Sequence, residues 1–392
     1  MADIPPYPLF NRTYTLYRVS PLHHGDQPLL HPPSLRTHAK RLKEQLKGDN
    51  VRGVEVDYAG TGDALPNLGP LQDCQWELIG DEDAWIDHHR QVVEPDASQL
   101  SSAMTVEQAR GIQVTLGYEK QSYNALLLRD PARTTVPEPF THLPLLLVKM
   151  PAPVRDIFLT YIRTSFDAHV VPMKLPSAFL TSSLETYFRH LSAPTSTQSI
   201  PDVIRQLQIQ LSFPNATSLL KHVDITIAGR HVSGFVDRGK AMNGSKDKPF
   251  ATALSSYIKT HLALDTSHPK VQISKITCGG FTLTTERLKL VAPETSSDVS
   301  FESSAPDTSA GQQAVDELYR SLVEEATSTG RFLPQDSTED VASSTPASAA
   351  SKNQPDRRKR AISSAAAGNN TTKRSKAKGR GNERRDQEMV DA

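Results

Sequence analysis

The sequence predicts an α+β fold in which mostly antiparallel sheets carry helices packed on one face, followed by a disordered C-terminal tail. Segments with alternating apolar and polar residues, typical of strands, come mostly in neighbouring pairs. Amphipathic stripes with helical period lie between these pairs. Strands that directly follow one another favour antiparallel pairing, whereas a doubly wound parallel sheet needs a helix after each strand. After about Val291 the composition changes to small and polar residues, so the folded body ends near that point.

The N-terminal part of the body is predicted to contain a strand, a helix and a run of further strands. Residues 9–19 are rich in Thr, Tyr and Phe and end at a Ser-Pro pair, which indicates a strand. From Ser34 onward, Leu35, Ala39, Leu42 and Leu46 fall on one face of a helix that ends at Gly48. Five more strands are expected, the third and fourth forming a hairpin: residues 51–58, 72–79, 112–118, 123–128 and 145–150.

The C-terminal part of the body alternates helices with strand pairs. Amphipathic stripes predict helices over residues 154–162, 179–191 and 250–262, the first of them beginning after two prolines. Alternation predicts strands over residues 207–213, 223–227, 271–278 and 281–283. Gly279 and Gly280 separate the last two, and glycines can adopt the positive φ angles of a tight hairpin turn. A closing β-ribbon is therefore expected here.

The predicted organisation is a folded body over residues 1–290, divisible into subdomains 1–150 and 151–290, a linker at 291–311, a short amphipathic helix at 312–327 and a disordered basic tail at 328–392. Val315, Leu318, Leu322 and Val323 form the apolar stripe of the short helix. A helix of this length is marginal alone, so it is expected to dock on the body or on a partner. The tail lacks aromatic residues from about Pro334 onward, so it cannot build a core.

Composition indicates an intracellular protein. The two cysteines, Cys74 and Cys278, exclude a disulfide framework and favour a buried structural role. No signal peptide precedes the body, and no segment approaches the roughly 20 apolar residues that span a bilayer. A net charge of zero hides a split, because residues 351–392 contain 12 Lys and Arg against 5 Asp and Glu, a net of +7, which leaves −7 for the rest. Such asymmetry suggests an interaction arm.

The tail contains two basic clusters that resemble a bipartite nuclear localisation signal. Twelve residues separate them, so both can reach acidic pockets of an import receptor while the spacer loops out. A solvated charge run and a nonspecific nucleic-acid arm are the alternatives. The residues expected to act in nuclear import are Arg357, Arg358, Lys359, Arg360, Lys373, Arg374 and Lys376.

Other charged groups predict no catalytic centre. Asp87, His88 and His89 form a weak metal-binding pattern without a second matching cluster, and the usual phosphate-loop, nucleophile-elbow and zinc motifs are missing. We therefore expect no enzyme, no metal and no cofactor. The 34–47 helix has a basic second face that could meet DNA phosphates or an acidic partner, although an ordinary solvated face is favoured: Arg36, Lys40, Arg41, Lys43 and Lys47.

Three passages of the body carry a family resemblance: residues 7–22 (YPLFNRTYTLYRVSPL), the passage from LRTHA at 35–39 to GDNVRGV at 48–54, and residues 140–147 (FTHLPLLL). They resemble the fungal CENP-L family of inner-kinetochore subunits. The similarity covers about residues 7–290 and excludes the tail. It implies a subunit of the constitutive centromere-associated network, located at the centromere and kinetochore, that supports chromosome segregation.

The resemblance also implies a CENP-N-like partner, bound through the C-terminal β-structure of the body at about residues 271–290. Within this segment the expected apolar anchors are Ile273, Ile276, Phe281 and Leu283. They could instead fill the chain's own core, because strand alternation sends only some side chains outward. The competing function is a nuclear nucleic-acid-binding protein that uses the basic tail and the basic helix face, with DNA contact otherwise weak or indirect.

Overall fold

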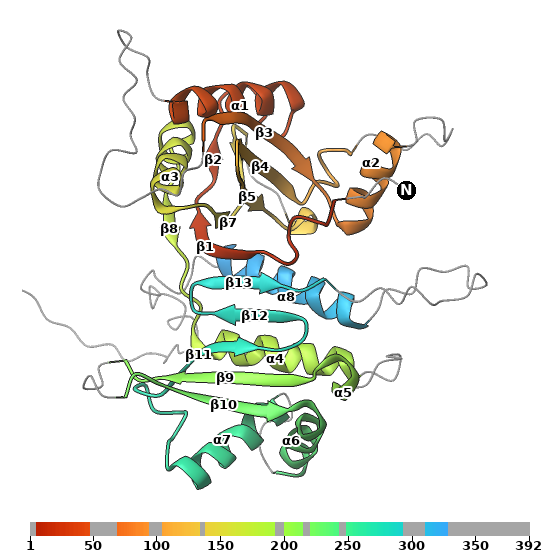
Figure 1. The fold of residues 1–392 in the computed structure, drawn as a ribbon, viewed down its shortest axis with the longest axis vertical. Coiled ribbons are helices and arrows are strands. Elements are labelled where there is room, and N and C mark those ends of the chain that lie inside the picture. Colours follow the sequence, from red (N-terminus) through yellow and green to blue (C-terminus); the bar gives the residue numbers. More distant parts are fainter. Residues whose placement is uncertain are drawn as a thin grey trace, which may run out of the picture. The chain divides into compact units, whose positions relative to one another are not determined.

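The computed structural model describes residues 5–47, 69–93, 104–133, 138–192, 200–214, 220–242, 248–292 and 310–327 of the chain (Figure 1). All of these described residues belong to one compact unit. The strand expected at residues 51–58 and the basic tail lie outside the described residues. The α+β class and the antiparallel arrangement predicted from the sequence are confirmed.

One large antiparallel sheet organises this unit, in the order β10-β9-β11-β12-β13-β1-β7-β5-β4-β3. Strand β1 lies in its middle, pairing with β13 over its first residues and with β7 and β8 further along. We call β7, β5, β4 and β3 the N-wing and β13, β12, β11, β9 and β10 the C-wing. The strands are β1 Thr13–Val19, β3 Leu71–Ile79, β4 Gly111–Tyr118, β5 Ser122–Leu128, β7 Leu145–Lys149, β8 Val170–Pro172, β9 Gln206–Ser212, β10 His222–Ala228, β11 Gln272–Thr277, β12 Phe281–Thr284 and β13 Arg287–Leu290, with β2 Leu22–His23 and β6 Phe140–Thr141 paired separately.

Two apolar clusters lie on opposite faces of the sheet, and β1 contributes to both. Tyr14 and Leu16 point into the first cluster, whereas Tyr17 and Val19 point into the second. The second cluster lies between the N-wing and two helices, α1 Pro32–Lys47 and α3 Ala152–Phe166. In α1 the predicted stripe is confirmed, since Leu35, Ala39 and Leu42 are buried.

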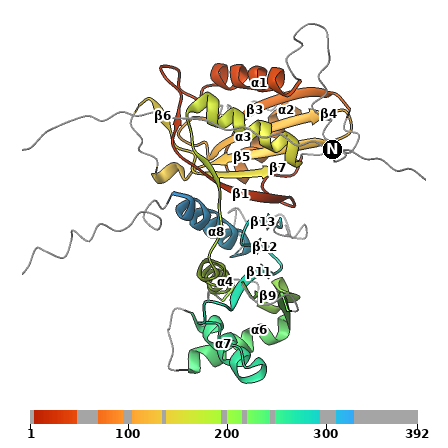
Figure 2. The same ribbon diagram turned by 90° about the vertical axis from the view of Figure 1, so that its left-hand side faces the viewer.

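The first cluster joins the C-wing to the remaining long helices. These are α4 Ser177–Leu191, α6 Gly229–Ala241, α7 Pro249–Leu262 and α8 Ala310–Thr327, and α2 Glu82–Val93 adds Trp85 at its margin. Two short helices lie in connections: Pro131–Arg133 between β5 and β6, and α5 Ile200–Val203 between α4 and β9. Figure 2 shows α4 and α8 together on one side of β11, β12 and β13.

Helix α8 is docked on this chain's own body, one of the two possibilities that its short length predicted. It lies against α4 and also against β1 and β7, so it bridges the two wings. The Arg110 guanidinium is 3.2 Å from the Asp316 carboxylate, and the Tyr319 hydroxyl donates to the Arg129 carbonyl oxygen at 2.5 Å. Near the other end of α8, the Arg18 guanidinium donates to the Glu325 carbonyl oxygen at 2.6 Å.

Several features differ from the sequence predictions. Helices α2 and α6 were not predicted, because α2 has few apolar residues and α6 contains two internal glycines. The closing ribbon has a third strand, β13. Gly279 and Gly280 lie between β11 and β12 as expected, but neither has a positive φ angle. They are needed for space instead: a Cβ atom at Gly279 would collide with the Val203 carbonyl, and one at Gly280 with the Tyr187 ring.

Candidate partner-binding surface

The four predicted anchors lie on β11 and β12 with their side chains in the chain's own core. Ile276, Phe281 and Leu283 are fully buried, and Ile273 is 6% exposed. The Phe281 ring packs edge-on against Tyr187 of α4 at 5.4 Å between ring centroids. The first apolar cluster includes all four residues. Their role in binding a partner therefore stays a prediction, and the surface that a partner can reach from these strands is made by other residues.

The residues that alternate with the core positions form a polar surface on the opposite side of the C-wing. None of them belongs to either apolar cluster, and all are at least partly exposed. We call this surface the open face, because no described helix of the chain packs against it. Its residues are Gln206, Gln208 and Gln210 of β9, Lys275 and Thr277 of β11, Thr282 and Thr284 of β12, and Arg287 and Lys289 of β13.

Strand β10 is the outer strand of the C-wing. Its inner edge pairs with β9 along all seven residues, and its outer edge pairs with no described strand. Unpaired backbone N–H and C=O groups at a sheet edge can pair with a strand of another chain. Leu220, just before β10, is 53% exposed. This edge therefore combines free backbone groups with an exposed apolar side chain at its start.

The direction of the β10 backbone groups follows from the two hydrogen bonds that flank its ladder. The Phe213 amide donates to the Lys221 carbonyl oxygen and the Gly229 amide to the Arg205 carbonyl oxygen. In an antiparallel ladder hydrogen-bonded pairs alternate with non-bonded pairs. Residues 223, 225 and 227 therefore bond to β9, whereas the amide and carbonyl groups of residues 222, 224, 226 and 228 point outward. We call these outward groups the open edge.

The remaining charged and reactive groups have ordinary structural surroundings. The Asp87 carboxylate is 3.5 Å from the Arg90 guanidinium, and the His89 ring packs in a tilted arrangement against Trp85 at 4.1 Å between ring centroids. No group of three potential metal ligands occurs in the part of the chain that the structure describes. Burial raises the pKa values of Cys74 and Cys278 to about 12, which disfavours the thiolate form that a nucleophile needs.

The basic face of α1 lies at the surface. Arg36, Lys40, Arg41 and Lys47 are exposed, and the Lys43 ammonium group is 3.9 Å from the Asp73 carboxylate. This matches a solvated face and leaves phosphate binding a prediction. The seven residues predicted to act in nuclear import lie outside the described residues. Within the described residues, no helix combines the length and the apolar character needed to cross a bilayer.

The four predicted anchors face the chain's own core, and the exposed surface of the same strands is made by the residues between them. The open face and the open edge were not singled out, because their residues are polar and an apolar criterion passes over them. The alternation itself carried the signal: if Ile276 and Leu283 face a helix, then Lys275 and Thr284 face the other way.

The model of the family described as CENP-L, centromere protein L, matches residues 8–327. The chain belongs to the CENP-L family. The match extends past the body and includes α8, beyond the region in which the sequence alone showed the resemblance. No curated protein matches the chain.

Family membership gives this chain the role of an inner-kinetochore protein of the centromere, in a structural family that is not known for enzymatic activity. It implies association with other inner-kinetochore proteins and localisation at the centromere and kinetochore, hence in the nucleus. The family also accounts for the link to chromosome segregation. The fungal origin suggested by the resemblance stays a prediction.

Proposed function

We propose that the chain is a non-enzymatic structural subunit that pairs with a CENP-N-like partner through its C-terminal strands and so supports centromere assembly. The open edge of β10 is the observation that supports this proposal. Addition of a partner strand there would bond the outward amide and carbonyl groups of four residues and extend the existing sheet. The exposed side chain of Leu220 and the half-buried Val223 would add apolar contact beside the new strand.

A single proline substitution in β10 tests the pairing of this strand with the partner. Thr226→Pro removes an outward-pointing amide and leaves the bonds to β9 in place, since residue 226 lies between two bonded positions. Thr226→Ala is the matched control, because it shortens the side chain and keeps the amide. We expect co-expressed CENP-N-like partner to elute with the control and to separate from the proline variant in size-exclusion chromatography with light scattering. Equal pairing by both variants would remove β10 as the docking edge.

Nuclear entry is proposed to depend on the two basic clusters of the tail. The test fuses the full chain to tandem fluorescent proteins, so that the fusion is too large to enter by diffusion, and replaces Arg357–Arg360 and Lys373–Lys376 by alanine, separately and together. Loss of nuclear signal in each single replacement fits a bipartite signal, because both clusters are needed to hold the import receptor. Unchanged nuclear signal in the double replacement contradicts it.

Direct nucleic-acid binding is the alternative function. It predicts affinity that falls steeply with salt and depends little on sequence, because released counterions drive the contact between basic side chains and phosphates. Fluorescence anisotropy with a labelled duplex measures this. Deletion of residues 351–392 should then abolish most of the binding, and charge removal on α1 at Arg36, Lys40 and Arg41 should reduce the salt dependence further.

A further inference from the structure

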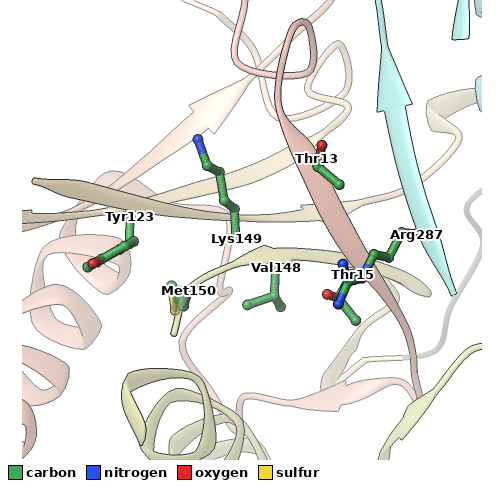
Figure 3. A pocket seen from close by; sticks show the side chains of 7 residues that line it. All are labelled: Thr13, Thr15, Tyr123, Val148, Lys149, Met150 and Arg287. Atoms are coloured by element: carbon green, nitrogen blue, oxygen red, sulfur yellow. The ribbon is translucent and has the colours of Figure 1, made fainter. Parts of the chain in front are cut away.

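A hollow of about 240 Å³ lies where the open face meets the N-wing. Its lining comes from four neighbouring strands of the sheet, β13, β1, β7 and β5, which do not follow one another in sequence. The fold, and not a local motif, therefore creates it. Figure 3 shows its lining, with Tyr123 on one side and Thr15 and Arg287 close together on the other. The lining residues are Thr13, Thr15, Tyr123, Val148, Lys149, Met150 and Arg287.

The floor of the hollow is apolar and its rim is polar. Val148 is buried in the second cluster, and Met150 and Tyr123 pack against that cluster while staying partly exposed. The Tyr123 hydroxyl donates to the Gln121 side-chain oxygen at 2.8 Å, which holds the ring as a wall. Thr13 and Thr15 bring hydroxyl groups from β1. An occupant would therefore place apolar atoms against the floor and polar atoms at the rim.

The rim carries excess positive charge. Arg287 lies opposite Thr15 and Lys289 opposite Thr13 in the pairing of β13 with β1, so both cations flank the hollow on the open face. Lys275 lies on the same face two strands away. Within the described residues, no carboxylate approaches any of these three cations to ion-pair distance. The nearby Glu286 carboxylate is 3.6 Å from Lys174 instead.

Size and charge together indicate the occupant. Pockets that bind small organic ligands usually measure about 300–1,000 Å³, so this hollow fits a single side chain better than a cofactor. A phosphate backbone is recognised by cations and does not need an apolar floor. We propose that the hollow anchors a segment of a partner polypeptide, with one apolar side chain on Val148 and Met150 and an acidic residue beside it on Arg287. This inference rests on the proposed function as a partner-binding subunit and adds a second contact, remote from the open edge.

The Met150 methyl group allows a direct test with the full chain. The protein is labelled with ¹³C at its methionine methyl groups, and the Met150 signal is assigned with Met150→Leu. Acetylated peptides Ser-Leu-Glu-Ser, Ser-Leu-Gln-Ser and Ser-Ala-Glu-Ser serve as probes. We expect the Ser-Leu-Glu-Ser peptide to shift the Met150 signal and to leave the signal of the exposed Met242 unchanged. The two altered peptides should bind more weakly, the glutamine peptide by roughly two- to fivefold, since a solvent-accessible ion pair contributes little.

Variants separate the charge contact from a general effect. Arg287→Gln should make the affinities of the Glu and Gln peptides equal. Lys259→Gln on α7 removes the same charge elsewhere and should leave both affinities unchanged. Absence of any Met150 shift overturns the proposal. A shift with a short DNA duplex and not with peptide assigns the hollow to nucleic acid, and a shift with protein concentration alone assigns it to a second copy of the chain; either result also overturns it. Thr226→Pro should lose the partner and keep the peptide response, so the two ideas fail independently.

Discussion

Truncation of Leu322 in α8 should destabilise the whole unit. Its side chain is fully buried between α4 and the sheet, in a helix whose inner face also buries Val315, Leu318 and Val323. Leu-to-Ala changes at buried sites usually cost about 2–5 kcal/mol, because the transfer energy of the removed atoms adds to the cost of the cavity. We expect Leu322→Ala to lower the free energy of unfolding by about 3 kcal/mol, which lies within that range.

The assay is guanidinium unfolding followed by circular dichroism, with Arg320→Ala as the control. Arg320 lies on the outer face of α8 with its side chain 61% exposed, so its removal should change stability by less than about 0.5 kcal/mol. Because α8 contacts β1, β7 and α4, its loosening should shift one common transition for both wings. Equal midpoints for the two variants would refute the docking of α8. A separate early transition in Leu322→Ala would refute the bridge between the wings.

Further predictions concern a histidine, two glycines and the cysteines. Burial, assisted by the Arg41 charge, lowers the pKa of His38 from 6.5 to about 4. The stability that neutral His38 contributes is therefore fully present above pH 6.5 and is lost as the pH drops toward 4. His38→Gln should reduce the difference between the urea midpoints at pH 7 and pH 5. Gly280→Ala should cost about 1–3 kcal/mol for lack of space, whereas Gly234→Ala inside α6 meets nothing within 4 Å and should be neutral or stabilising in the same unfolding assay. Cys278 and Cys74, the buried cysteine of β3, should react with a thiol reagent only after urea is added. Reaction at equal rates with and without urea would contradict their burial.

Local patterns predicted most of the elements and the composition of the core. The stripe of α1 and the alternation in β3, β4 and β9 needed only the rule that one face of each element is buried. Helix α6 escaped prediction because its burial depends on distant contacts: Gly239 lies so close to Pro249 of α7 that a side chain would not fit. Glycine weakens an isolated helix, and here the close packing of α6 on α7 outweighs that loss.

The candidate surface was harder to predict because a strand has two faces and sequence alone does not say which one its own helices will cover. Ile276 and Leu283 are apolar, and both lie in the chain's own core, where α4 packs on β11. The surface that these elements leave exposed is the complement: outward amides of β10, polar side chains of the open face and one small apolar hollow with a cationic rim. Backbone bonds at an edge fix the direction and register of an added strand but accept many sequences. Recognition of one partner therefore has to come from a side-chain site such as the hollow beside Arg287, and this is why the two sites are expected to act together.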